Sequence, residues 1–130
     1  MVALEDNCLY FSNSMKNQKV RRVIFYKNYF SNFFIKQRGK VKEKILWTLR
    51  LIENIQHIPV EYFKHIEGTN GLYEIRVKQR TDIFRIFCFF DETNIIVIIK
   101  GFQKKSQRIQ RNEIEKAIKI MREYYEEQKS

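Results

Sequence analysis

The fold is decided by the stretch LYEIRVKQRTDIFRIFCFFDETNIIVIIKGF, residues 72–102. Its first seven residues alternate apolar and polar side chains, which is typical of a strand with one buried face. In residues 82–90 a single arginine, Arg85, lies among apolar side chains, and residues 94–102 form a β-branched run that is apolar on both faces. Turn-forming residues separate the segments. The stretch therefore predicts three consecutive strands, of which the last lies centrally in its sheet.

Helical patterns precede and follow this stretch. Residues 40–55 predict an amphipathic helix, because apolar side chains recur at helical spacing, and the aromatic residues 29–36 predict a shorter helix that forms a hairpin with it. Residues 111–126 predict a terminal helix whose apolar stripe packs on the core. Residues 20–26 predict a first strand, and residues 60–68 an irregular connector.

Together these elements predict an α+β domain with the order β-α-α-β-β-β-α, in which the helical hairpin packs on a mainly antiparallel four-stranded sheet. The length of 130 residues fits one domain, which we place at residues 16–130. Residues 1–15 are polar and mixed, with no clear period. We interpret them as an upstream or engineered leader, with an ordinary native tail as an equal alternative.

The charge of the chain is the first functional indication. It carries 25 lysine and arginine residues against 15 aspartate and glutamate residues, a net charge of +10 at pH 7. An excess of this size predicts attraction to a polyanion, which includes RNA, DNA, an acidic protein and an anionic membrane surface. The alternative is that the charge serves solubility alone.

Several other classes of site are disfavoured. Cys8 and Cys88 are too few and too far apart to predict a disulfide framework or a zinc site. No apolar run approaches the roughly 20 residues that span a membrane, and no secretory signal is present, so we expect a cytoplasmic protein without a membrane partner.

Acidic residues are sparse in residues 72–105, and the four glycines form no phosphate-binding loop. We therefore expect no metal and no cofactor. A nuclease made from these residues would use the 2′-hydroxyl of RNA as its nucleophile, positioned and charge-stabilised by arginine, lysine and histidine side chains.

The strongest candidate site lies on the hairpin of the first two strands in the opening stretch. If Gln79 faces Asp82 across a two-residue turn, Arg76 lies opposite another arginine. That residue is Arg85, on the same face, and Glu74 lies diagonal to it. Two like charges placed opposite each other repel and destabilise the sheet, and a bound phosphate would reverse this effect. This favours ligand binding by Arg76, whereas for Arg85 a structural ion pair with Glu74 is an equal alternative.

Further candidates lie around this pair of arginines. Phe102 offers a ring on which a base can stack, and Lys104 and Lys105 can contact phosphate, as can Lys78 on the first strand of the hairpin. The alternative for the residues after the last strand is a solvated basic loop with Phe102 in the core.

Lys64 and His65 precede the hairpin. A histidine can act as general acid or base near neutral pH, which makes His65 our first candidate for that role. A lone histidine in a connector is more often a surface residue without a catalytic role.

These motifs resemble a known family. The segments FKHIEG (63–68), GLYEIR (71–76), FRIF (84–87) and GFQKK (101–105), followed by NEIEKA (112–117), resemble the phage-derived, HigB-like branch of the RelE/ParE toxin superfamily. The similarity covers residues 20–125, in the same order of elements.

The resemblance implies the toxin of a type II toxin–antitoxin system, an mRNA interferase that cleaves mRNA on the ribosome without a metal. Its implied partners are the ribosome with its mRNA and a cognate antitoxin, often of helix-turn-helix type, through which it reaches operator DNA. It also implies that Arg76 and Arg85 hold the phosphate and stabilise the transition state. Lys64 and His65 fall near basic residues of the preceding loop, and Lys104 or Lys105 near the basic position after the last strand.

Two departures from the family pattern leave alternatives open. Glu74 stands where relatives often have a lysine, and no tyrosine lies near residues 108–111. One alternative is a catalytically decayed toxin that acts only with its antitoxin in operator binding. The other is a ParE-like inhibitor of DNA gyrase, although a gyrase inhibitor does not need a basic cluster on the sheet.

Overall fold

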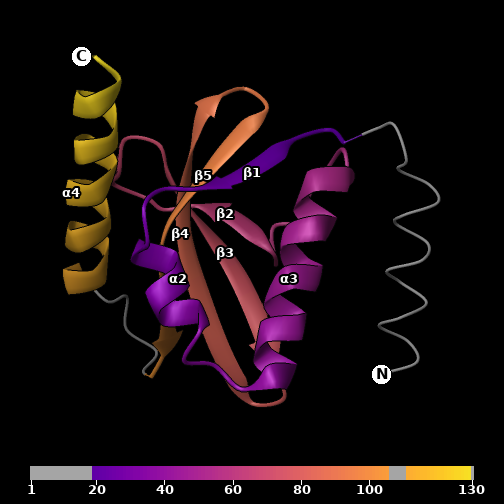
Figure 1. Ribbon diagram of the computed structural model, residues 1–130. Helices are drawn as coiled ribbons and strands as arrows, with labels where there is room; N and C mark the ends of the chain where they lie inside the picture. Colours follow the sequence, from indigo (N-terminus) through magenta and orange to yellow (C-terminus); the bar gives the residue numbers. More distant parts are fainter. Residues whose placement is uncertain (1–18, 106–110, 130) are drawn as a thin grey trace.

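The computed structural model describes residues 19–105 and 111–129, and in this part of the chain one sheet lies between helices on both of its faces (Figure 1). The predicted leader, residues 1–15, lies outside the described residues. None of the helices in the described part is long and apolar enough to cross a membrane. The strands are β1 (Arg22–Phe25), β2 (Phe63–His65), β3 (Leu72–Gln79), β4 (Asp82–Glu92) and β5 (Ile95–Lys104); the helices are α2 (Tyr29–Phe34), α3 (Gly39–Asn54) and α4 (Arg111–Gln128).

The α+β class is confirmed, but the predicted four-stranded sheet is wrong. The described residues form a five-stranded mixed sheet in the order β1-β5-β4-β3-β2, with β1 parallel to β5 and the other pairs antiparallel. The additional strand, β2, lies within residues 60–68, where the sequence predicts an irregular connector. Three residues are too short to show a period of two, and β2 is defined by its backbone pairing with β3.

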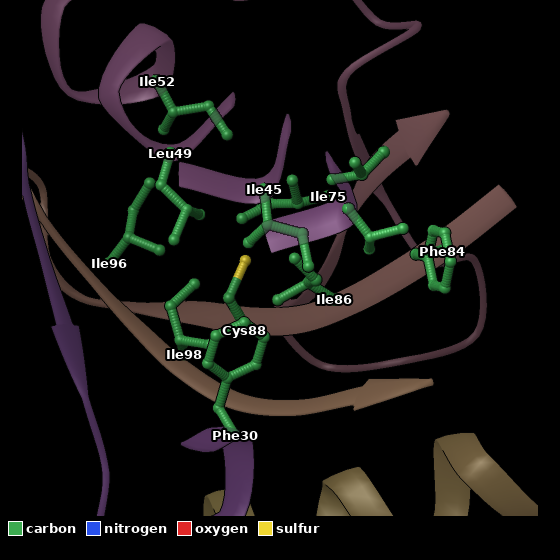
Figure 2. Packing of buried hydrophobic residues seen from close by; sticks show 12 residues of the cluster. Phe30, Ile45, Leu49, Ile52, Ile75, Phe84, Ile86, Cys88, Ile96 and Ile98 are labelled. Atoms are coloured by element: carbon green, nitrogen blue, oxygen red, sulfur yellow. The ribbon is translucent and has the colours of Figure 1, made fainter. Parts of the chain in front are cut away.

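One core lies between the sheet and the helices α2 and α3. Figure 2 shows side chains of α3 meeting those of the sheet around Cys88. The buried side chains of this α3-side core are Phe30, Val41, Ile45, Leu49, Ile52, Ile75, Val77, Phe84, Ile86, Cys88, Ile96 and Ile98. Burial in these apolar surroundings raises the pKa of the Cys88 thiol, which therefore acts here as a packing residue.

A second core lies between α4 and the opposite face of the sheet. Ala117, Met121 and Tyr124 of α4 are buried there against residues of β3, β4 and β5. The hydroxyl of Tyr124 donates a hydrogen bond of 2.7 Å to Asp91, and burial raises the pKa of Tyr124 to about 12. The apolar stripe predicted for the terminal helix is therefore a packing face.

Two local contacts join the α3-side elements. The guanidinium of Arg21 donates hydrogen bonds to the carbonyls of Ile52, Ile55 and Gln56 at 2.7–2.8 Å, and so binds the end of α3 to the start of β1. Gly101 of β5 lies beneath the ring of Phe33, where a Cβ atom would be only 2.5 Å from the ring. Glycine at this position therefore allows α2 to approach the sheet.

Candidate functional site

The α4 side of the sheet places the predicted arginines next to each other. Gln79 pairs with Asp82, and Arg76 pairs directly with Arg85, as the pairing argument predicts. The rung continues to β5, where Phe102 is the partner of Arg85. Side chains on one rung of a sheet point to the same face, so these three lie side by side.

A cavity of about 420 Å³ opens over this part of the sheet, a volume within the range of small-ligand sites. The four residues that we predict to be catalytic, from β2, β3 and β4, all line it. The full lining is Val60, Glu61, Phe63, Lys64, His65, Ile66, Glu67, Glu74, Arg76, Arg85, Phe87 and Ile114.

Arg85 has a partner in the cavity. Its Nε atom lies 3.0 Å from Oε2 of Glu74, and the side chains are only 11% and 12% exposed. The ion pair lacks hydrogen-bond geometry, so neither atom makes a hydrogen bond to any residue of the described chain. Buried polar atoms normally have such a partner, so the charges of this pair are compensated by proximity and not by a hydrogen bond.

Arg76 differs from Arg85 in its surroundings. Its side chain is exposed at the cavity. It makes no ion pair with any of the described residues, 19–105 and 111–129. A guanidinium without a counter-charge can bind a phosphate group bidentately. Among the described residues, the cavity thus combines one arginine without a counter-charge and one that pairs with a carboxylate.

Lys64 and His65 lie on β2 but point in different directions. Lys64 pairs with Glu74, two residues before Arg76 on β3, and is therefore on the cavity face. The ring of His65 packs edge-on against that of Tyr73, with centroids 5.2 Å apart, and Tyr73 packs on the α3-side core. His65 lines the cavity, yet alternation along the strand directs its ring to the other face.

The predicted RNA-binding residues lie at the margin of the cavity or beyond it. Phe102 is half-buried and packs edge-on against Phe87, with centroids 5.2 Å apart. Lys78 and Lys104 flank Ile83 two rungs beyond the arginines and on the same face. Lys105 is exposed after the end of β5. None of these four lines the cavity.

Some residues of the site are not among the sequence-based candidates. Glu61 and Glu67 line the cavity from the segments beside β2. Lys100 lies on the rung of Glu74 and forms an ion pair of 3.0 Å with Glu113, at the start of α4. The only sequence signal for Lys100 was its place in the last strand, one residue before the glycine.

The part of the chain that the structure describes holds no group of three or more His, Cys, Asp or Glu side chains that could bind a metal ion. The charged groups at the cavity are arginine, lysine and carboxylate side chains. This arrangement can bind a phosphate group and stabilise additional negative charge on it.

Comparisons with known proteins complete the description. The family model for "Phage derived protein Gp49-like (DUF891)" matches residues 32–122, more than half of the chain. Among solved structures the chain is similar to one in the crystal structure of the archaeal RelE–RelB complex from Pyrococcus horikoshii OT3, with 18% identity and a TM-score of 0.47. That match covers 69% of this chain and 99% of the other. No curated protein sequence matches significantly.

Proposed function

Because the chain belongs to the phage-derived Gp49-like family, we propose that it is the toxin of a type II toxin–antitoxin system and cleaves mRNA on the ribosome without a metal. Family membership agrees with the resemblance to phage-derived, HigB-like proteins. The observation that carries the proposal is the pairing of Arg76 with Arg85 at the floor of a cavity large enough for a nucleotide.

In the proposed reaction the 2′-hydroxyl of one nucleotide attacks the adjacent phosphorus atom. The new bond is O2′–P and the broken bond is P–O5′, so the products are a 2′,3′-cyclic phosphate and a 5′-hydroxyl. The proton of the 2′-hydroxyl leaves to a base, and the departing O5′ takes up a proton. Negative charge accumulates on the phosphate oxygens, where arginine side chains stabilise it most.

The residues take separate roles in this proposal. Arg76 binds the scissile phosphate, since it forms no competing ion pair with a described residue. Arg85 stabilises the transition state, and Glu74 holds its guanidinium in place. Lys64 reaches the same phosphate from β2 and replaces His65 as the preferred proton-transfer candidate, because the ring of His65 packs on Tyr73.

The remaining predicted residues extend the mRNA path. Lys78 and Lys104 continue the basic face beyond the arginines, and Lys105 follows at its end. These lysines would hold the phosphates next to the scissile one. Phe102 supports this path from below, since its ring is packed against Phe87.

The partners follow from the same proposal. A cognate antitoxin, of helix-turn-helix type, would bind the chain and cover the cavity, and operator DNA would be contacted only through that antitoxin. Such a toxin works in the cytoplasm, where the ribosomes are.

Induced expression tests the function. We expect the wild-type chain to arrest growth, and primer extension to show cleavage within translated codons. Arg76→Ala should abolish arrest while circular dichroism shows an unchanged fold, because Arg76 is exposed and its loss leaves no buried charge. If folded Arg76→Ala and Arg85→Ala variants both remain fully toxic, the assigned site is wrong.

One observation favours a second candidate, a decayed toxin that only joins its antitoxin. Arg85 already has a counter-charge in Glu74, which would weaken its hold on a phosphate. This candidate predicts no growth arrest with retained antitoxin binding. Gyrase supercoiling assays with the purified chain test the ParE-like alternative.

A further inference from the structure

Much of the positive charge lies outside the cavity. Residues 36–50 contain six basic residues and one acidic residue, a net charge of +5, which is half of the net charge of the chain. They belong to α3 and to the turn before it. We call this set the α3 basic surface: Lys36, Arg38, Lys40, Lys42, Lys44 and Arg50.

The α3 basic surface faces away from the cavity. α3 and α4 lie on opposite faces of the sheet (Figure 1). α3 packs Ile45 and Ile52 on one face, whereas Arg76, Arg85 and the α4 residue Ile114 line the cavity on the other. Lys36, Arg38, Lys40 and Arg50 are exposed, and Lys42 and Lys44 are half-buried. Neither the cavity nor the proposed cleavage therefore accounts for these charges.

Few of these charges have an opposite partner in the protein. Arg38 forms an exposed ion pair of 3.4 Å with Asp82, and the other five basic residues form none with any described residue. The ammonium groups of Lys42 and Lys44 lie over aromatic rings instead, at 5.9 and 4.5 Å from the centroids of Phe34 and Trp47.

The arrangement is unfavourable for the helix itself. Lys40 and Lys44 are four residues apart on one helix, a spacing at which like charges repel each other. Lys40 and Lys42 lie in the first turn, where the helix dipole favours acidic residues and where α3 has none. A bound polyanion would remove both costs.

The chemistry of the surface favours nucleic acid over an acidic protein. A protein interface needs a desolvated apolar centre, and within residues 35–50 Ile35 and Leu46 are the only large apolar residues that are more than half exposed. The basic residues from Lys40 to Arg50 instead extend over about 15 Å of helix, at a rise of 1.5 Å per residue. This spacing suits a row of phosphates.

We propose that the α3 basic surface binds the phosphodiester backbone of folded RNA, as a contact separate from the cavity. With the proposed function as its premise, this surface holds the chain on ribosomal RNA while the cavity meets mRNA on the opposite face. Its contacts carry no sequence information, since they reach only phosphate and ribose.

Salt dependence of RNA binding tests the proposal. The full chain with Arg76→Ala, which is expected to be non-toxic, serves as the parent. The α3 variant adds Lys40→Gln, Lys44→Gln and Arg50→Gln, and a matched control adds Lys116→Gln, Lys119→Gln and Arg122→Gln at exposed positions of α4. Both variants lose three positive charges. The probes are a fluorescent RNA hairpin of 16 base pairs and purified 70S ribosomes.

Each lost phosphate contact reduces the slope of log K against log salt by about 0.7–0.9. We expect the α3 variant to lose about 2–3 from the slope magnitude for both probes, and the control to lose less than about 1. Equal losses in the two variants would show that only net charge matters and would overturn the proposal, as would an unchanged slope in the α3 variant.

The same variants distinguish RNA binding by this surface from binding of an acidic protein and from the proposed cleavage site. If the α3 variant binds both RNA probes like the parent but no longer co-purifies with the antitoxin, the surface serves an acidic protein and the proposal is wrong. If the slope falls as expected while Arg76→Ala and Arg85→Ala remain toxic, the RNA contact stands and the proposed cleavage site fails.

Discussion

Arg85 lies directly opposite Arg76 on the β3–β4 hairpin, yet of the two only Arg85 has a counter-charge among the described residues, the Glu74 carboxylate at 3.0 Å. The two arginines are chemically the same but differ in what they can do. Arg85 is nearly buried and held in one place, whereas Arg76 is exposed and free to meet an anion. Glu74 therefore sets how much of the positive charge in the cavity is available to a phosphate.

Glu74→Gln tests this role of the carboxylate. The change keeps the shape of the side chain but leaves Arg85 nearly buried without a counter-charge. We expect the free energy of unfolding to fall by about 1–3 kcal/mol, less than for a fully buried pair because both side chains keep some exposure. Inorganic phosphate should then raise the melting temperature of Glu74→Gln more than that of the wild type, since it binds the released guanidinium.

Glu67→Gln is the matched control for Glu74→Gln. Glu67 also lines the cavity but is exposed and forms no ion pair with any residue of the described chain. We expect its unfolding free energy and its response to phosphate to match those of the wild type. An equal response to phosphate in all three proteins would contradict the role given to Glu74.

Arg21→Ala tests the contact between β1 and the end of α3. Arg21 donates to three backbone carbonyls that α3 and the residues after it leave without helical partners. We expect the variant to lose about 2 kcal/mol of unfolding free energy in urea, because hydrogen bonds from a charged donor are lost while one of them is exposed. Arg21→Lys should recover part of this loss, since a single ammonium cannot span all three acceptors. A loss below about 0.5 kcal/mol would show that water replaces the guanidinium without cost.

Gly101→Ala tests the close approach of α2 to the sheet. The added Cβ atom would lie 2.5 Å from Phe33, whose ring is held between Phe30 and Phe84. We expect a destabilisation of about 1–3 kcal/mol, typical of overpacking. In a Phe33→Leu background the same substitution should cost clearly less, so a double-mutant cycle should give a coupling above about 0.5 kcal/mol. Additive effects would place the strain elsewhere.

The hairpin of the site could be predicted because its information is local. Alternation along residues 72–78 and a two-residue turn determine the register, and the register determines that Arg76 and Arg85 are partners. The same register places Glu74 near Arg85, whereas the burial of that pair depends on the packing of the whole fold.

The other side of the cavity depends on β2, which could not be predicted in the same way. Its three residues acquire strand geometry from β3, and no pattern of their own reveals it. If the segment were an irregular connector, the side chains of Lys64 and His65 could lie in one site. Because the two residues are neighbours on a strand, their side chains point to opposite faces of the sheet. The positions of Glu61 and Glu67 at the cavity depend on the same pairing, and no sequence pattern predicts them.

Lys27 connects the start of α2 to the end of α4, and this contact makes stability depend on pH. Its ammonium contacts Glu123 and lies 2.9 Å from Glu127, and the hydroxyl of Tyr29 donates to Glu123 at 2.8 Å. The hydrogen bond from Lys27 holds the pKa of both carboxyl groups below the ordinary value of 4.5, and these bonds raise the pKa of Lys27.

The direction of the pH effect follows from these shifts. A carboxyl group with a lowered pKa stabilises the folded chain above its ordinary pKa, and this stabilisation is lost as the pH falls through the folded value. The raised pKa of Lys27 acts oppositely, so its contribution is complete below pH 10.5 and is lost as the pH rises through the higher folded value. We therefore expect Lys27→Met to lower the melting temperature at pH 7, and the difference from the wild type to shrink as the pH falls below about 4.5. Thermal unfolding followed by circular dichroism between pH 3 and pH 8 measures both effects.

Lys129→Met, which breaks only an exposed pair with Glu126, should follow the wild type throughout. A difference for Lys27→Met that stays constant down to pH 3 would show that the lysine acts through packing and not through its charge.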